Sequence, residues 1–194
     1  MIFNKKLIYK IIDNKITTLT LSNLNKQELN VLYHALNLNH SLKILYLCDN
    51  EIKDITLLCK SLKNNSCLQK LDLTFNQIED ITALKFLSKF CLEVLDLTNN
   101  KIEDITPLKF LSNSCLKEIS LFDNQIEDIS PLKFLENNSC LEKLDLSHNK
   151  IKDIISLKFL ENISCLKKLY LIGNQIEDIS PLKFLENGYY MFNI

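Results

Sequence analysis

Apolar residues recur along the chain in a fixed unit. Residues 92–100 read L-x-x-L-x-L-x-x-N, and closely similar units begin at Leu42, Leu68, Leu116, Leu141 and Leu166. The closing residues of these units are Asn50, Asn76, Asn100, Asn124, Asn149 and Asn174, so the period is 24 to 26 residues. A seventh, degenerate unit begins at Ile16 and has Leu24 in place of the Asn. A period of this length indicates a repeat architecture.

Inside each unit, apolar and polar positions alternate, which predicts a short strand. In residues 92–100, Leu95 and Leu97 are expected to face a core, and Val94, Asp96 and Thr98 to face outward. One short strand cannot bury its apolar face alone, so the units must stack as a parallel sheet. The pattern therefore predicts an α/β repeat fold. We expect a right-handed solenoid curved into an arc or horseshoe, with the sheet on its concave face and short helices or 3-10 turns on its convex face.

The repeated unit resembles that of leucine-rich-repeat proteins, over about nine tenths of the chain. Residues 124–135 read N-x-I-x-D-I-x-P-L-x-x-L, which resembles the repeats of bacterial internalins and of nuclear phosphatase regulators. The first unit differs, because residues 25–37 place Leu29, Leu32, Tyr33 and Leu36 at helical spacing. That segment resembles the longer, helix-bearing repeats of ribonuclease-inhibitor type. The resemblance implies a protein that binds other proteins.

The period favours a single domain over residues 1–194, with seven repeats in residues 16–187. Residues 1–15 are expected to cap the first turn, with residues 7–12 as an extra edge strand or a cap, because an open solenoid end would expose its core. The last segment, residues 188–194, departs from the repeat. It is open whether this segment is a cap, an exposed tail or the remainder of a truncated array.

Three columns of equivalent residues have structural interpretations. The Asn that closes each unit is expected to hydrogen-bond backbone groups of its own and neighbouring turns. An Asp column is expected to cap the loop before each convex element: Asp54, Asp80, Asp104, Asp128, Asp153 and Asp178. Ser130 and Ser180, each followed by Pro, are expected to be N-caps. A cysteine column, expected to be reduced and buried, consists of Cys67, Cys91, Cys115, Cys140 and Cys165.

Composition argues against several classes of function. The chain has 23 basic and 24 acidic residues, so no bulk field attracts nucleic acid or an anionic membrane. No apolar run is long enough for a signal-peptide core or a membrane span, which predicts an intracellular protein, in the cytoplasm of a host cell if the source is viral. With two glycines there is no phosphate-binding loop or nucleophile elbow. The three scattered histidines have no metal-ligand spacing. We expect no catalytic residues, no metal and no cofactor, and a monomer.

The outward strand positions vary from unit to unit, unlike the core positions, so only they can specify a partner. Aromatic side chains framed by charges are typical of protein interfaces. Asp72 and Asp96 should be neighbours, and either a basic partner or nearby lysines and water would relieve their repulsion. The predicted partner-binding residues are Ile44, Tyr46, Lys70, Asp72, Phe75, Val94, Asp96, Glu118, Ser120, Phe122, Lys143, Asp145, Lys168, Tyr170 and Ile172.

The leading hypothesis is a non-catalytic protein-protein interaction module that binds another protein through its concave face. The phosphatase-regulator resemblance implies a second hypothesis, a regulatory subunit that docks on an enzyme. The internalin resemblance implies a third, a secreted or cell-surface adhesion protein, which would need an export signal.

Overall fold

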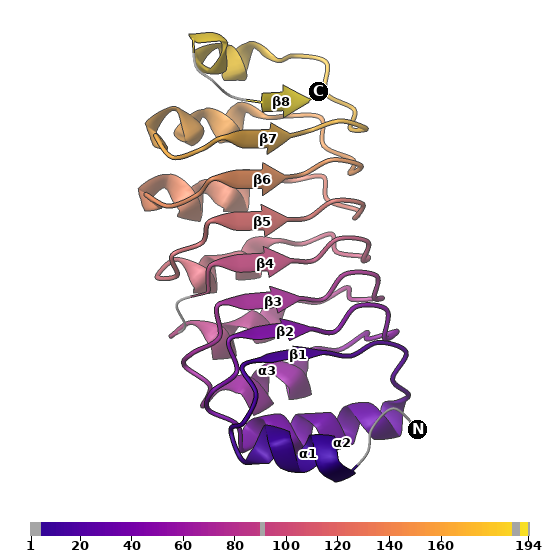
Figure 1. Cartoon of the computed structure of the whole chain (residues 1–194). Coiled ribbons are helices and arrows are strands. Elements are labelled where there is room, and N and C mark those ends of the chain that lie inside the picture. Colours follow the sequence, from indigo (N-terminus) through magenta and orange to yellow (C-terminus); the bar gives the residue numbers. More distant parts are fainter. Residues whose placement is uncertain (1–4, 90–91, 188–190, 194) are drawn as a thin grey trace.

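The computed structural model describes residues 5–89, 92–187 and 191–193, and one open parallel sheet runs through the stack (Figure 1). Each strand pairs with the next strand along the chain. The strands are β1 (Thr18–Thr20), β2 (Ile44–Tyr46), β3 (Lys70–Asp72), β4 (Val94–Asp96), β5 (Glu118–Ser120), β6 (Lys143–Asp145), β7 (Lys168–Tyr170) and β8 (Met191–Asn193). This arrangement confirms the predicted solenoid, and the seven predicted repeats supply β1 to β7.

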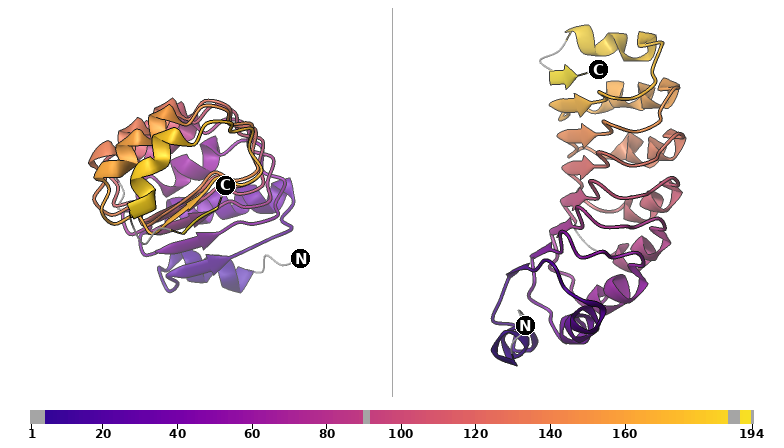
Figure 2. Two further views of the ribbon diagram at one scale, coloured as in Figure 1. Left: turned by 90° about the horizontal axis from the view of Figure 1, so that it is seen from above. Right: turned by 90° about the vertical axis from the view of Figure 1, so that its right-hand side faces the viewer.

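Helices and 3-10 turns cover the side of the stack that lies opposite the sheet (Figure 2). They are α2 (Lys26–Asn37), α3 (Thr56–Leu62) and the 3-10 helices η1 (Thr82–Leu87), η2 (Thr106–Leu111), η3 (Ser130–Asn137), η4 (Ile155–Asn162) and η5 (Ser180–Asn187). The helix expected in residues 25–37 is confirmed. It begins with a reciprocal capping box, in which the Asn25 side chain accepts from the Glu28 backbone and the Glu28 carboxylate accepts from the Asn25 backbone. Figure 2 shows the stack bending toward the sheet, which is therefore its concave face.

Of the two alternatives expected for residues 7–12, an extra edge strand or a cap, the edge strand is wrong. Residues 5–12 form a helix, α1 (Lys5–Ile12), that lies beside α2 at the base of the stack (Figure 1). Leu7, Ile8, Ile11 and Ile12 recur at helical spacing and pack on the core, and Ile11 is fully buried. The additional strand lies at the other end, where β8 pairs with β7 and places Met191 opposite Lys168. Residues 188–190 and 194 of the final segment lie outside the described residues.

The core is a continuous column of leucine and isoleucine between the sheet and the convex elements. Leu95 and Leu97 are fully buried, as predicted, and so are Leu71 and Leu73 in the preceding turn. Equivalent residues of successive turns stack on one another, so every turn buries the apolar face of its neighbours. No helix among residues 5–89 and 92–187 is long and apolar enough to cross a membrane.

The Asn column lies inside the corner after each strand, and its predicted role is confirmed. The Asn76 side-chain oxygen accepts from the backbone N–H of Ile52 at 2.9 Å, and its amide donates to the carbonyls of Leu47 and Leu73, both at 2.9 Å. Similar bonds recur at Asn100 and Asn124. The column therefore joins each turn to the turn before it.

The Asp column caps the convex elements, as expected, but the prediction of Ser130 as an N-cap is wrong. The residue at the N-cap of η3 is Ile129, which makes no side-chain capping bond. The Asp128 carboxylate instead accepts from the Ser130 backbone N–H at 2.8 Å. Asp178 and Ser180 repeat this contact before η5. Each serine is thus inside its 3-10 turn and bound to the preceding Asp.

The prediction that the cysteine column is buried is also wrong. Cys67 and Cys115 are exposed, and Cys140 and Cys165 are half-buried. Each cysteine directly precedes a leucine that faces the core, so its own side chain is directed away from the core as the chain extends toward the strand. Cys91 lies outside the described residues.

Candidate functional site

The side chains that point away from the core form three rows across the sheet, and most of them are half-buried. The strand pairings place the first row in register: Ile44, Lys70, Val94, Glu118, Lys143 and Lys168. The middle row follows two residues later: Tyr46, Asp72, Asp96, Ser120, Asp145 and Tyr170. A third row, two residues further, consists of Cys48, Thr74, Thr98, Phe122, Ser147 and Ile172. We call the three rows together the concave face. Fourteen of the predicted partner-binding residues belong to them, since Phe75 alone of those residues lies outside the rows.

The first row carries both signs of charge. Glu118 of β5 lies next to Lys143 of β6, and Lys143 lies next to Lys168 of β7. Glu118 is exposed, whereas the two lysines are half-buried. The basic end of this row lies at the C-terminal half of the sheet, where Lys143 also approaches the ring of Tyr170 at 5.8 Å.

Asp72 and Asp96 are direct neighbours in the middle row, as the sequence predicted. Asp72 is only 8% exposed, and its carboxylate accepts from the Cys48 thiol and from the Thr74 backbone N–H, both at 3.2 Å. Burial raises the pKa of Asp96 above its ordinary value, and the nearby Asp72 carboxylate adds to this, while hydrogen bonds from Thr98 and the charge of Lys143 lower it. The centre of the concave face therefore has two adjacent carboxyl groups.

Aromatic rings flank this acidic centre. Tyr46 of β2 lies next to Asp72 and is contacted by the Lys70 ammonium group at 4.9 Å from the ring centroid. Tyr170 of β7 lies next to Asp145 at the other side. Both tyrosines are half-buried, so each keeps an apolar surface open to a partner.

Phe75 lies outside the three rows, in the turn that follows β3. It is 58% exposed and its backbone φ is 53°. Ile172 is 41% exposed, close to the end of β7. These two residues place apolar surface at the edge of the sheet where the strands end.

His148 extends this edge, although it is not among the predicted partner-binding residues. Its ring lies 5.0 Å from the Phe122 ring, with the two planes at 55°. It also lies over Gly173, because a Cβ atom at that glycine would be 2.9 Å from His148 Nδ1. The sequence feature that could have indicated it is its position, because His148 directly precedes Asn149 just as Phe75 directly precedes Asn76.

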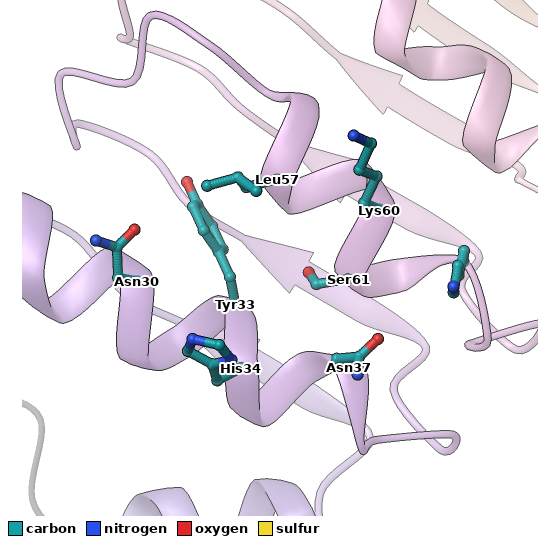
Figure 3. A pocket seen from close by; sticks show the side chains of 8 residues that line it. Asn30, Tyr33, His34, Asn37, Leu57, Lys60 and Ser61 are labelled. Atoms are coloured by element: carbon teal, nitrogen blue, oxygen red, sulfur yellow. The ribbon is translucent and has the colours of Figure 1, made fainter.

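A hollow that the sequence did not indicate lies between α2 and α3 on the convex side. Its cavity of about 240 Å³ is lined by Tyr33, His34, Leu57 and Lys60, among others. Figure 3 shows the Tyr33 and Leu57 side chains reaching toward one another from the two helices. Burial raises the pKa of the Tyr33 hydroxyl to about 12, and negative charge at Cys59 and Asp54 contributes. A neutral phenol beside an exposed leucine is suited to packing and not to proton transfer near pH 7.

Within the described part of the chain, no group of three or more His, Cys, Asp or Glu side chains is arranged to hold a metal ion. The titratable groups of the concave face are three Asp carboxylates that accept from backbone N–H groups, the carboxylate of Glu118, lysines, two tyrosines and one thiol. That thiol, Cys48, has its pKa raised by burial and by Asp72, so it is a poor nucleophile. The chemistry of the face is suited to binding.

Comparison with known families gives two matches. The family described as "Leucine Rich repeats (2 copies)" matches residues 40–86 and 141–184. The family described as "Leucine rich repeat" matches residues 66–126 and 90–151. Together the matches extend from residue 40 to residue 184. Among curated proteins, none matches this sequence.

Solved structures similar to this chain include two internalins of Listeria monocytogenes. Internalin C2 is 31% identical, with a TM-score of 0.65, and the match covers 96% of this chain and 84% of internalin C2. The internalin inlF is 26% identical, with a TM-score of 0.55, and the match covers 92% of this chain and 61% of that protein. The similarity extends over almost the whole stack of repeats.

Proposed function

Because this chain belongs to the leucine-rich-repeat family, we propose that it is a non-catalytic interaction module that binds another protein through its concave face. One contrast carries the proposal. The core and corner positions repeat the same residues from turn to turn, whereas the middle row reads Tyr, Asp, Asp, Ser, Asp, Tyr. A constant scaffold with a variable face is able to specify a partner without altering its fold.

The mixture of side chains supports a protein partner over other kinds of ligand. Tyrosines beside charged groups are typical of the central parts of protein interfaces. Val94 and Glu118 separate Lys70 from Lys143 and Lys168 in the first row, which leaves no continuous positive surface for a phosphate backbone. A protein surface is able to match both signs of charge and the aromatic rings.

The protein is further proposed to act as a monomer inside the cell, without a cofactor. A reducing environment is supported by exposed Cys67 and half-buried Cys140 and Cys165, because thiols in such positions are prone to oxidation in an oxidising compartment. A regulatory subunit that docks on an enzyme would use the same face, and only the identity of the partner would distinguish it from an adaptor.

The experiment is a comparison of two faces. A partner recovered from the native cell is identified by mass spectrometry, purified, and titrated against the wild-type chain by calorimetry. The Tyr46→Ala, Asp96→Ala, Tyr170→Ala triple variant is expected to lose at least about 2 kcal/mol of binding free energy while keeping its fold. The matched control replaces Glu103, Glu127 and Lys133, which are exposed on the loops and convex side. If the control loses binding and the triple variant keeps it, the concave face is the wrong assignment.

A further inference from the structure

The turns that follow the strands share one backbone conformation. The residue at this position has a positive φ between 53° and 73° in seven successive turns. These residues are Asn23, Asp49, Phe75, Asn99, Asp123, His148 and Gly173. Left-handed backbone is tolerated by glycine, and among other residues it is enriched in Asn, Asp and His. Six of the seven turns therefore carry a residue type suited to the conformation.

Phe75 is the exception. A bulky aromatic residue in the left-handed region strains the backbone, because its Cβ approaches the following carbonyl oxygen and no polar side-chain atom compensates. The neighbouring turns adopt almost the same φ with Asp49 and Asn99, at 55° and 53°. The turn thus does not need phenylalanine, and the strained residue lowers the stability of the chain.

Packing does not explain the phenylalanine either. Phe75 is 58% exposed, whereas the aromatic residues within the three rows, Tyr46, Phe122 and Tyr170, are half-buried. The core of the same turn is completed by Leu71 and Leu73, which are fully buried. The backbone of Phe75 therefore carries a free-energy cost in the isolated protein, and burial of its ring does little to offset that cost. Strain of this kind is typical of residues maintained for binding.

The charges beside Phe75 define the chemistry of a partner. Asp72 lies three residues earlier, at the end of β3, and Asp96 lies next to Asp72. Asp49 occupies the equivalent turn position one repeat earlier and is exposed. The Lys70 ammonium group lies over the Tyr46 ring, and the positive charge of Lys143, two strands from Asp96, lowers the pKa of Asp96. A positive group from outside would relieve the repulsion between the paired carboxylates.

We infer that Phe75 is an anchor residue for a protein segment that places an apolar side chain against its ring and a lysine or arginine over Asp72 and Asp96. This inference rests on the proposed function and specifies the partner's chemistry. The apolar contact would bury a ring that is otherwise in water, and the cation would neutralise the acidic pair. The binding free energy would thereby offset the strain that Phe75 imposes on the free chain.

The first test is a reciprocal exchange measured by thermal unfolding. Phe75→Asn is expected to raise the Tm by about 2–4 °C, because Asn suits the left-handed turn better than Phe does. Asp49→Phe, which puts the aromatic residue into the same conformation one repeat earlier, is expected to lower the Tm by a similar amount. A Tm that falls in Phe75→Asn would mean that the ring stabilises the fold, and would overturn the inference.

The second test uses a displayed library of random peptides selected on the wild-type chain. The enriched peptides are expected to carry Lys or Arg close to an apolar residue. Their affinity should fall at least about thirtyfold for Phe75→Asn and about tenfold for the Asp72→Asn, Asp96→Asn double variant. Leu57→Asn is the matched control, because Leu57 is 56% exposed on the convex side. It should leave the affinity unchanged.

The outcomes separate this inference from the proposed function. Peptides that depend on Tyr46 and Tyr170 but not on Phe75 would overturn the anchor role and leave the concave face as the binding face. Peptides that depend only on Leu57 would contradict both. A selection that yields no peptide dependent on Phe75 counts against the anchor role.

Discussion

Asn76 Oδ1 accepts a hydrogen bond from the backbone N–H of Ile52, 24 residues earlier, at 2.9 Å. The Asn76 amide donates to Leu47 of the earlier turn and to Leu73 of its own turn. One buried side chain thus satisfies backbone groups of two turns that no water reaches. Without the Asn76 side chain, those backbone groups would be buried and unpaired. The cost of leaving them unpaired is the larger part of the expected loss of stability.

We therefore predict that Asn76→Ala lowers the free energy of unfolding by about 3 kcal/mol or more, since several buried backbone groups lose their partner at about 1–3 kcal/mol each. Urea unfolding followed by circular dichroism measures the change. Glu103→Ala is the control, because Glu103 is exposed and its loss is expected to change stability by less than about 0.5 kcal/mol. Equal stability of the two variants would contradict the structural role of the Asn column.

The core offers a second prediction. Leu97 is fully buried, and Leu97→Ala should lower the free energy of unfolding by about 2–5 kcal/mol through lost burial and a residual cavity. Val94→Ala, on the outward side of β4 in the same repeat, should cost less than about 1 kcal/mol because Val94 is only half-buried. If the two variants unfold at the same urea concentration, the inward and outward assignments are wrong.

The sheet was predictable from the sequence because its physical cause is local and repeated. The core residues equivalent to Leu95 and Leu97 alternate with outward-facing residues in every unit, and a one-residue shift would expose the whole apolar column. The Asn column was predictable for a similar reason, since a buried corner needs a polar side chain with both a donor and an acceptor. These features depend on periodicity, which is visible in a single sequence.

The ends and the segments between repeats were less predictable. Leu7 and Ile11 suit a strand or a helix at so short a length, and only packing against α2 selects the helix. The cysteines recur with the same period as the core leucines, and each one directly precedes the first leucine of its unit. The period alone therefore does not determine which way their side chains point. The backbone strain at Phe75 was invisible, because it depends on a φ value that Asp49 and Asn99 share and sequence does not display.

Cysteine reactivity gives a prediction that follows from the corrected positions. Cys67 is exposed and should be labelled by a maleimide within minutes in the native protein. Cys59 is fully buried, with its pKa raised to about 12 mainly by burial, and should be labelled only after unfolding. Peptide mapping by mass spectrometry after a short native pulse distinguishes the two sites. Labelling of Cys59 ahead of Cys67 would contradict the burial described here.

Asp96 provides a prediction about pH. Its pKa is raised in the folded protein, mainly by burial and further by Asp72, so folding favours the protonated carboxyl. The group therefore contributes stability below its unfolded pKa, near 4, and loses that contribution as the pH rises through the folded value. Above the folded pKa the charged carboxylate is less favourable to folding than its protonated form, whereas an Asn at this position would stay neutral and could still accept from the Thr98 N–H, which is 3.0 Å from Asp96 Oδ1.

Asp96→Asn is consequently expected to unfold at a higher urea concentration than the wild type at pH 7 and at nearly the same concentration at pH 3. Asp145→Asn is the matched control, because Asp145 also accepts from a backbone N–H two residues ahead, that of Ser147, but has Ser120 and Tyr170 as its neighbours in the row. Its substitution should give a smaller gain at pH 7, since no carboxylate stands next to it. A wild type more stable than Asp96→Asn at pH 7 would show that the charged bond to Thr98 outweighs burial and repulsion. The acidic pair would then stabilise the free protein and would not favour a basic partner.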